Sequence, residues 1–217
     1  MFKDQDNSLV CINLKYRRDR AIEMKRQLGD IPFTFVDACE PKDHPIPELS
    51  KKSKEKNGNG IYCCATSHVE VIRRAQKYGC SYLTILEDDA ILCDDFLERI
   101  KIIEDSEIDF DMCYIGGHFA KEKEDIEKTD IPHLWKAFNI GGTYGYIIKC
   151  QSEAADFLIR NWNYDYGIDE FYCDHIQTRF NCYAFLPFLV GHNSGYSDVN
   201  GWVVYADYNQ YFQKEKL

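Results

Sequence analysis

The sequence predicts a single α/β domain built around a parallel sheet. Its opening residues have the pattern of a buried strand, an amphipathic helix and a second strand, an order that favours parallel pairing. With 217 residues, of which 45% are hydrophobic, the chain is long enough for one sizeable core. Acidic residues also follow a predicted strand directly, at the place where open α/β sheets bind ligands.

The first elements follow from apolar spacing. Residues 8–14 form a short apolar run that is typical of a buried strand, and 17–28 have the spacing of a helix that ends at Gly29. A second strand is expected over 33–36. Because residues 40–60 are rich in Pro, Lys, Ser, Asn and Gly, we expect a mobile surface loop there.

The middle of the chain repeats the alternation of helix and strand. Helical spacing resumes over 64–78, and a strand over 81–86 leads directly into three carboxylates. A helix is expected over 94–104 and a strand over 111–115. The charged connector over 121–130 is expected to be a solvated loop or helix face.

The last third is expected to contain further strands and helices and a polar tail from Gly191. Two of these strands are expected to flank the glycine pair Gly141 and Gly142. The expected strands and helices cover, in order, 135–138, 144–148, 152–162 (helix), 169–180 (helix) and 182–188.

Charge and hydropathy exclude several classes of protein. The chain has 26 Lys and Arg against 36 Asp and Glu, a net charge of -10, which disfavours general nucleic-acid binding. No run of about 18 apolar residues exists, so no transmembrane helix is expected. The first seven residues are too polar to open a secretory signal, so we expect a cytoplasmic protein.

The ten cysteines are expected to be buried free thiols. They are scattered, mostly in apolar segments, and no CxxC pair occurs. Adjacent Cys63 and Cys64 are poorly placed for one tetrahedral ion, so a zinc site is disfavoured.

Glu87, Asp88 and Asp89 are the strongest local signal for chemistry. In an extended backbone Glu87 and Asp89 point to one side and Asp88 to the other, and two carboxylates on one side can hold a hard divalent cation. The alternative is a strand end followed by an acidic helix start. Because a buried strand that ends on three carboxylates needs a compensating cation, we favour the metal site.

A basic segment contrasts with the acidic chain. Residues 13–26 contain six basic and two acidic side chains. Arg17 and Arg20 could bind phosphate, and Tyr16 could stack on a base, although an ordinary solvated helix face fits equally well. Ser67 and His68 lie in a predicted helix, where a lone histidine is more often structural, and no hydrolase triad is evident.

Taken in order, these motifs resemble glycosyltransferase family 25, which includes lipooligosaccharide and collagen galactosyltransferases. The resemblance covers about residues 8–200, and each motif is weak alone but the ordered set is specific. The motifs are Ile12-Asn13-Leu14 with Arg17 and Arg20, Cys64 with Ser67-His68, Leu86-Glu87-Asp88-Asp89, Thr143-Tyr144-Gly145-Tyr146, Asp169-Glu170 with Asp174, Tyr183 with Pro187, and Ser197-Asp198.

The resemblance implies a GT-A (Rossmann-like) domain with a mixed central sheet, spanning 1–217. It implies an inverting transfer of a sugar, galactose or glucose, from a UDP-sugar to a hydroxyl of a glycan or hydroxylated protein. Mn²⁺ or Mg²⁺ would be bound by Glu87, Asp89 and His192, although His192 could equally be a surface histidine. The donor-binding residues implied are Asn13, Leu14, Tyr16, Arg17, Arg20, Ser67, His68, Asp88, Gly142 and Tyr144.

Asp169 and Glu170 are the candidate catalytic bases, since inversion needs a group that takes the acceptor's proton. Helix capping is the alternative for Asp169, and a tight turn is the alternative for the Gly141-Gly142 segment. Cys63, where many family members have glycine, and the lysine-rich 40–60 loop depart from the family pattern.

The sequence is compatible with more than one function. A nucleotide-sugar hydrolase, and a catalytically silent glycan-binding or scaffold module, are the competing functions. A homodimer and a bacterial or viral origin are compatible with the sequence, which identifies neither the sugar nor the acceptor.

Overall fold

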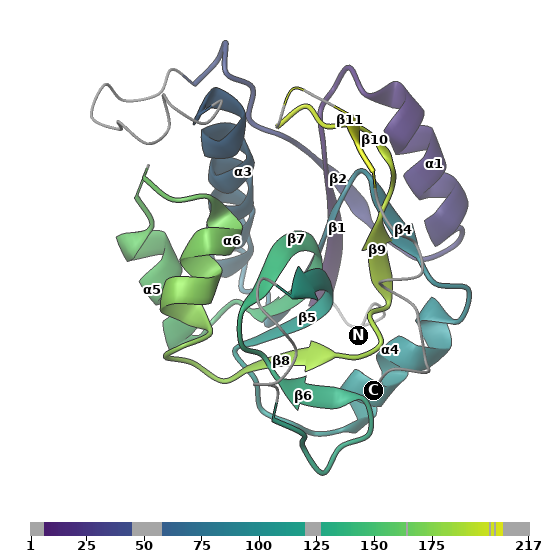
Figure 1. Ribbon diagram of the computed structural model, residues 1–217, viewed down its shortest axis with the longest axis vertical. Helices are drawn as coiled ribbons and strands as arrows, with labels where there is room; N and C mark the ends of the chain where they lie inside the picture. Colours follow the sequence, from purple (N-terminus) through teal and green to yellow (C-terminus); the bar gives the residue numbers. More distant parts are fainter. Residues whose placement is uncertain are drawn as a thin grey trace.

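The computed structural model describes residues 7–44, 58–119, 127–163, 165–199, 201 and 203–205. A mixed β-sheet forms the middle layer, and helices cover both of its faces (Figure 1). The helical elements are α1 (Arg18–Leu28), α3 (Gly58–Lys77), α4 (Phe96–Asp105), α5 (Glu153–Asn161), α6 (Ile168–Phe171) and the π-helical turn η2 (Tyr172–Ile176).

The strands are ordered β2-β1-β3-β7-β5-β8-β6 across the main sheet, and β4 and β9 pair beside it. Their bounds are β1 (Asn7–Asn13), β2 (Thr34–Asp37), β3 (Tyr82–Glu87), β4 (Ala90–Leu92), β5 (Met112–Phe119), β6 (Leu134–Lys136), β7 (Ile140–Lys149), β8 (Cys182–Phe185) and β9 (Val190–His192). A separate hairpin joins β10 (Gly195–Tyr196) to β11 (Val203–Val204).

Parallel pairing dominates the first half of the sheet. Strand β1 pairs in parallel with β2 on one side and with β3 on the other. Strand β7 is antiparallel to both β3 and β5, and β8 is parallel to β5. The carboxyl ends of β1, β3 and β5 therefore meet at one edge, with a reversal of strand order between β1 and β3.

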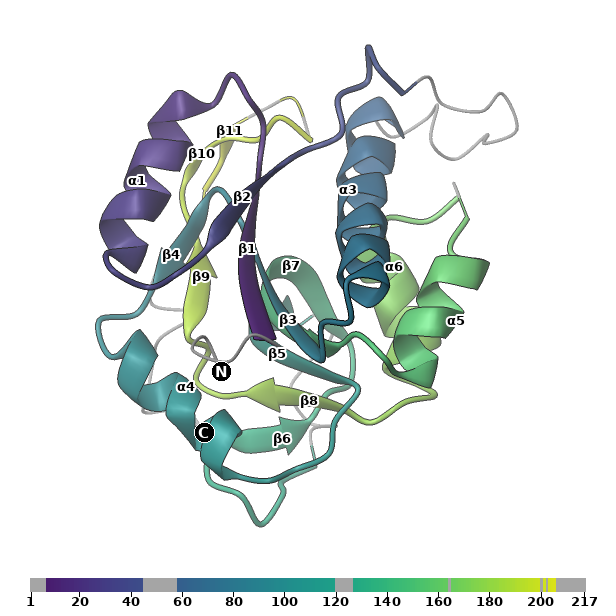
Figure 2. The same cartoon turned by 180° about the vertical axis from the view of Figure 1, so that it is seen from behind.

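Side-chain alternation along the strands divides the core into two layers. Val10 and Ile12 of β1 pack with α3, α5 and α6, whereas Leu9 and Cys11 pack with α1 and α4 on the opposite face. Figure 2 shows these two groups of helices on opposite sides of the sheet. This is the two-sided burial expected of a sheet that has helices on both faces.

Local signals account for several helix ends. The acidic Asp19 lies in the first turn of α1 and the basic Lys25 and Arg26 lie in its last turn, as the helix dipole favours. Gly29 follows with a φ of 55°, a conformation that suits glycine. Helix α5 is capped by Ser152, whose hydroxyl accepts a hydrogen bond from the Ala155 amide at 3.2 Å.

Most predicted elements are confirmed, but several boundaries were wrong. Helix α3 begins at Gly58 rather than 64, because its first turn lies within the polar stretch assigned to a loop. Of that predicted 40–60 loop, residues 45–57 lie outside the described residues, as do 120–126 of the charged connector. The expected helix over 169–180 is a four-residue α-helix that continues as the π-helical turn η2.

The glycine pair was also misassigned. Gly141 and Gly142 lie inside β7 rather than in a turn between two strands, and β6 pairs with β8 instead. A Cβ on Gly141 would lie 2.9 Å from His118 Nε2, so glycine there leaves room for the His118 ring of the neighbouring strand. The short strands β4, β9, β10 and β11 were not predicted.

The structure also bears on the predictions about the cysteines and about membrane-spanning helices. All ten cysteines are free thiols, as expected, and six are buried while four are half-buried. Within the described part of the chain, no helix combines the length and apolar character needed to cross a membrane.

Candidate active site

A cavity of about 840 Å³ opens at the edge where β1 and β3 end. This is the reversal point of strand order, where open α/β sheets bind their ligands. Every predicted site residue except Asn13 and Arg17 lines the cavity. Those two lie directly behind it, hydrogen-bonded to the lining residues Asp88 and Asp198 respectively.

Asp88 ties β1 to β3. Its Oδ2 accepts hydrogen bonds from Asn13 Nδ2 at 2.7 Å and from the Leu14 amide at 3.4 Å. Its Oδ1 lies 2.5 Å from Arg20 Nη1. Burial raises the pKa of Asp88, and the Arg20 charge opposes that rise. Asp88 is therefore a buried, fully partnered group that positions the end of β1.

Arg20 is the cation that faces the acidic strand end. The same Nη1 lies 3.0 Å from Asp89 Oδ2, and Nη2 donates to the Tyr196 carbonyl at 2.8 Å. The prediction that Asp88 and Asp89 point to opposite sides is wrong, because β3 ends at Glu87 and the next two residues form a turn. Strand alternation does not apply beyond that residue.

A second cluster neutralises the start of the basic segment. Arg17 Nη1 lies 2.5 Å from Asp198 Oδ2, and its other nitrogens pair with Asp19. Tyr16 donates to Asp198 Oδ1 at 3.0 Å. Burial and this hydrogen bond raise the pKa of Tyr16 to about 12. Asp198 belongs to the Ser197-Asp198 motif but was not predicted as a site residue, and the structure brings it to the cavity.

Glu87 faces the α3 side of the cavity. Its Oε1 accepts a short hydrogen bond from Thr143 Oγ1, and His68 Nε2 lies 3.2 Å from the same oxygen. His68 is buried, and its Nδ1 lies 2.8 Å from the Tyr146 hydroxyl, which bonds that of Tyr172 at 3.0 Å. Thr143 and Tyr146 belong to a predicted motif but were not predicted as site residues, and Tyr172 was missed, because only the packing of the fold brings them to Glu87 and His68.

Asp89 and His192 form a separate pair, with His192 Nε2 3.5 Å from Asp89 Oδ2. Burial alone would raise the pKa of Asp89, but the contacts with His192 and Arg20 outweigh it and lower the pKa. Burial alone would lower the pKa of His192, but the contact with Asp89 outweighs burial and raises the pKa. Each of the two groups thus stabilises the charged form of the other when no cation is bound.

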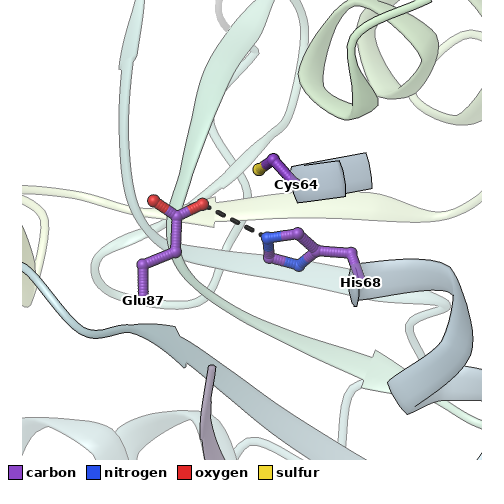
Figure 3. A group of neighbouring side chains, drawn as sticks. All are labelled: Cys64, His68 and Glu87. Carbon is purple, nitrogen blue, oxygen red and sulfur yellow. Dashed lines mark hydrogen bonds and ion pairs between the residues drawn. The ribbon is translucent and has the colours of Figure 1, made fainter. Parts of the chain in front are cut away.

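Asp89 has an oxygen that fits a hard divalent cation, but Glu87 does not lie beside it as predicted. The buried Oδ1 of Asp89 has no hydrogen-bond partner among the described residues, as a metal ligand would. In the described chain, however, the compact group of metal-ligating types is Cys64, His68 and Glu87, within 4.8 Å of one another (Figure 3). Glu87 thus sits in a different group from Asp89 and His192.

The two candidate bases differ in exposure. Asp169 is half-buried, and its carboxylate accepts from the Gly142 amide at 3.4 Å and from the Glu170 amide at 2.9 Å. Glu170 is exposed and accepts from the Gly167 amide at 3.3 Å. The cap of α6 is Gly167, so the capping alternative for Asp169 is wrong.

The remaining predicted residues shape the cavity wall. Gly142 has a φ of 76°, and a Cβ there would lie 2.9 Å from Tyr144 Cζ. The Tyr144 hydroxyl lies 3.1 Å from His118 Nδ1, and its ring packs against His192 with centroids 5.0 Å apart. The Ser67 hydroxyl accepts from the Cys39 amide at 2.8 Å and donates to the Cys63 carbonyl, which fixes the chain after β2 on α3.

The α/β/α layers, the mixed sheet and a cavity at its reversal point define a GT-A (Rossmann-like) domain. The family model of glycosyltransferase family 25 (LPS biosynthesis protein) matches residues 7–172, and the chain belongs to this family. The resemblance drawn from the ordered motifs is thereby confirmed.

Two individual proteins show the range of similarity. A relative from Haemophilus influenzae named "Putative glycosyltransferase" is 29% identical over 106 residues, which are 45% of this chain and 37% of that protein. The match thus spans little more than a third of the relative's length. The crystal structure of a glycosyltransferase involved in glycosylation of the major capsid of PBCV-1 has a TM-score of 0.51 and 11% identity, covering 88% of this chain and 94% of that one. At this identity the likeness shows the fold alone.

Proposed function

We propose that the chain transfers a sugar from a nucleotide-sugar donor to an acceptor hydroxyl in the cavity at the ends of β1 and β3. The observation that carries this proposal is the convergence of the family's motif residues on one cavity of about 840 Å³. Its volume suits a nucleotide sugar, since ligand pockets of this kind measure about 300–1,000 Å³. A UDP-sugar of galactose or glucose is the proposed donor, and a glycan or hydroxylated protein the acceptor.

Asp169 is the better candidate for the base of an inverting reaction. It lines the cavity, and two backbone amides orient its carboxylate. In the proposed step the carboxylate takes the acceptor's proton while the acceptor oxygen bonds to the anomeric carbon. The bond from that carbon to the nucleotide diphosphate breaks, and the diphosphate leaves with the electron pair. Glu170 is solvent-exposed and is the second candidate.

Asp89, with His192 beside it, would hold Mn²⁺ or Mg²⁺, whereas Glu87 lies in a different group. Such an ion supplies charge that stabilises the departing diphosphate. On the protein side, Arg20 lines the cavity and already binds carboxylates, so its planar donors suit phosphate oxygens as well. Tyr16 lies at the same wall with more than half of its surface exposed, and its ring is available to stack on a base.

A screen of UDP-sugars for binding and turnover, with and without Mn²⁺, tests the proposal. We expect one UDP-sugar to bind, and product analysis with candidate acceptors to show transfer with inverted anomeric configuration. Release of free sugar regardless of acceptor would indicate a hydrolase, and binding without any turnover would indicate a silent module. The absence of binding by every nucleotide sugar would overturn the proposal.

A further inference from the structure

The α3 wall of the cavity contains three different metal-ligating side chains. Cys64 and His68 lie one helical turn apart on α3, and Glu87 ends β3 opposite them (Figure 3). The sulfur, a ring nitrogen and a carboxylate oxygen all lie within 4.8 Å of one another. We propose that Cys64, His68 and Glu87 bind a thiophilic divalent cation of the Zn²⁺ type, with its fourth position open to the cavity.

The donor set and its spacing fit zinc. Zinc accepts sulfur, imidazole nitrogen and carboxylate oxygen together in a tetrahedral arrangement, and sites with three protein ligands leave one position open. Bonds of the usual zinc lengths place a nitrogen and an oxygen ligand roughly 3.4 Å apart. His68 Nε2 and Glu87 Oε1 are already 3.2 Å apart. The i,i+4 spacing of Cys64 and His68 places both side chains on one helix face.

The partners of these ligands hold them in place. A metal-bound histidine usually donates its other ring N–H to a fixed acceptor, which sets the tautomer. His68 Nδ1 lies 2.8 Å from the Tyr146 hydroxyl. The Thr143 hydroxyl donates to Glu87 Oε1 and so orients the Glu87 carboxylate. Both supporting residues belong to β7, so the rigid sheet backs the ligand group.

The tyrosine pair suits both states of the histidine. Without a cation, His68 Nε2–H can donate to Glu87, and Nδ1 then accepts from the Tyr146 hydroxyl. With a cation on Nε2, the proton must sit on Nδ1, and Tyr146 must accept it. The reversal is possible because Tyr146 and Tyr172 hydroxyls face each other at 3.0 Å, and either one can be the donor.

Cys64 is protonated until a cation arrives. Burial and the nearby carboxylates of Glu87 and Asp169 raise the pKa of this thiol well above its ordinary value. A coordinated divalent cation reverses that balance, because a coordinating thiol loses its proton. The sulfur–metal bond forms as the thiol proton passes to water.

This site differs in chemistry from the carboxylate–imidazole pair formed by Asp89 with His192, which contains no sulfur. Mn²⁺ and Mg²⁺ favour oxygen ligands, whereas a thiolate selects zinc-like ions. The sequence disfavoured zinc because it lacks paired cysteines, but here one cysteine joins a helix neighbour and a distant strand end. The inference does not depend on sugar transfer, and its test needs no nucleotide.

Titration of the full chain with Co²⁺ tests the proposal. Cobalt replaces zinc and gives a thiolate-to-metal charge-transfer band in the near ultraviolet when sulfur is a ligand. We expect one saturable band, displaced by Zn²⁺, in the parent protein and its loss in Cys64→Ser. The adjacent variant Cys63→Ser is the matched control and should retain the band. A parent protein without the band, or a band that persists in Cys64→Ser, would overturn the proposal.

Two further variants separate this site from its neighbours. Tyr146→Phe removes the partner of His68 Nδ1, and loss of such outer partners weakens metal binding about 10–100-fold. A Zn²⁺ affinity unchanged in Tyr146→Phe would contradict the assigned role of His68. Asp89→Asn should leave the cobalt band in place, and its disappearance there would move the cation to Asp89 and refute the site. Circular dichroism confirms that each variant is folded before titration.

Discussion

Arg20 shows at the scale of one residue how charge is balanced at the end of β3. The sequence argument for a metal was that three carboxylates after a buried strand need a cation. In the structure a guanidinium from α1 supplies that charge to Asp88 and Asp89. Predicting this contact required the approach of α1 to β3, since the partners are 68 residues apart along the chain. The case for a divalent ion therefore rests on the buried Asp89 oxygen that has no hydrogen-bond partner among the described residues.

Asp89→Asn tests that oxygen. Because the change keeps the shape of the side chain but removes its charge, we expect the fold to survive and metal-dependent sugar transfer to fall about 100-fold or more, the scale of several kcal/mol of lost charge stabilisation. Steady-state turnover at saturating Mn²⁺ is the measurement. Asp94→Asn, an exposed acid outside the cavity lining, is the control and should retain parent turnover. Equal rates in the two variants would refute the assignment of Asp89.

Gly142→Ala tests the shape of the cavity wall. The residue has a φ of 76°, and an added Cβ would meet Tyr144 and His118 at 2.9 and 3.0 Å. We expect a loss of about 1–3 kcal/mol in the free energy of unfolding from strain and crowding, measured by urea denaturation. Gly29→Ala is the control for strain alone, because its φ is 55° and no described atom lies within 4 Å of the added Cβ. A smaller loss in Gly142→Ala than in Gly29→Ala would contradict the crowding.

Apolar periodicity determined which elements could be predicted. The runs over 8–14 and 81–86 were found because each is buried on both faces and continuous in sequence. Strands β4, β9, β10 and β11 were missed because each has two or three residues and too little pattern to mark it. The continuity of β7 through Gly141 was missed because glycine punctuates turns in sequence, whereas here it permits contact with His118.

The packing of α3 on the sheet gives a prediction at the scale of elements. Ile72 is fully buried between α3 and the sheet layer that contains Val10 and Ile12. We expect Ile72→Ala to lower the free energy of unfolding by about 2–5 kcal/mol, because it removes buried methyl groups and leaves a cavity. Arg73→Ala, next in the chain but exposed, should change it by about 0.5 kcal/mol or less. Chemical denaturation of both variants measures the free energy of unfolding. If Ile72→Ala lowers it as little as Arg73→Ala does, Ile72 does not anchor α3 on the sheet.

At the scale of the whole molecule, the site is completed by the end of the chain. Strand β9 returns to pair with β4 and β5 and brings His192 to Asp89. Beyond it, Asp198 reaches Tyr16 and Arg17 at the start of α1. The backbone of Val199 lies so close to Gly60 that a Cβ there would be 2.6 Å from its carbonyl oxygen. Sequence motifs placed these residues in order but could not show that three distant segments enclose one cavity.

Asp198 is therefore expected to hold the C-terminal segment against α1. Asp198→Asn removes the ion pair with Arg17 and weakens the hydrogen bond from Tyr16. Hydrogen bonds to charged groups contribute about 1.5–3 kcal/mol each, so local opening of residues 195–199 should become at least tenfold more frequent. Hydrogen exchange measures this opening directly, with the amides of β3 expected to stay protected because the core is untouched. The exposed Asp19→Asn, which leaves the Asp198 contact with Arg17 in place, is the matched control. If exchange in 195–199 rises equally in both variants, Arg17 rather than Asp198 controls the segment, and the cavity wall is held from α1 alone.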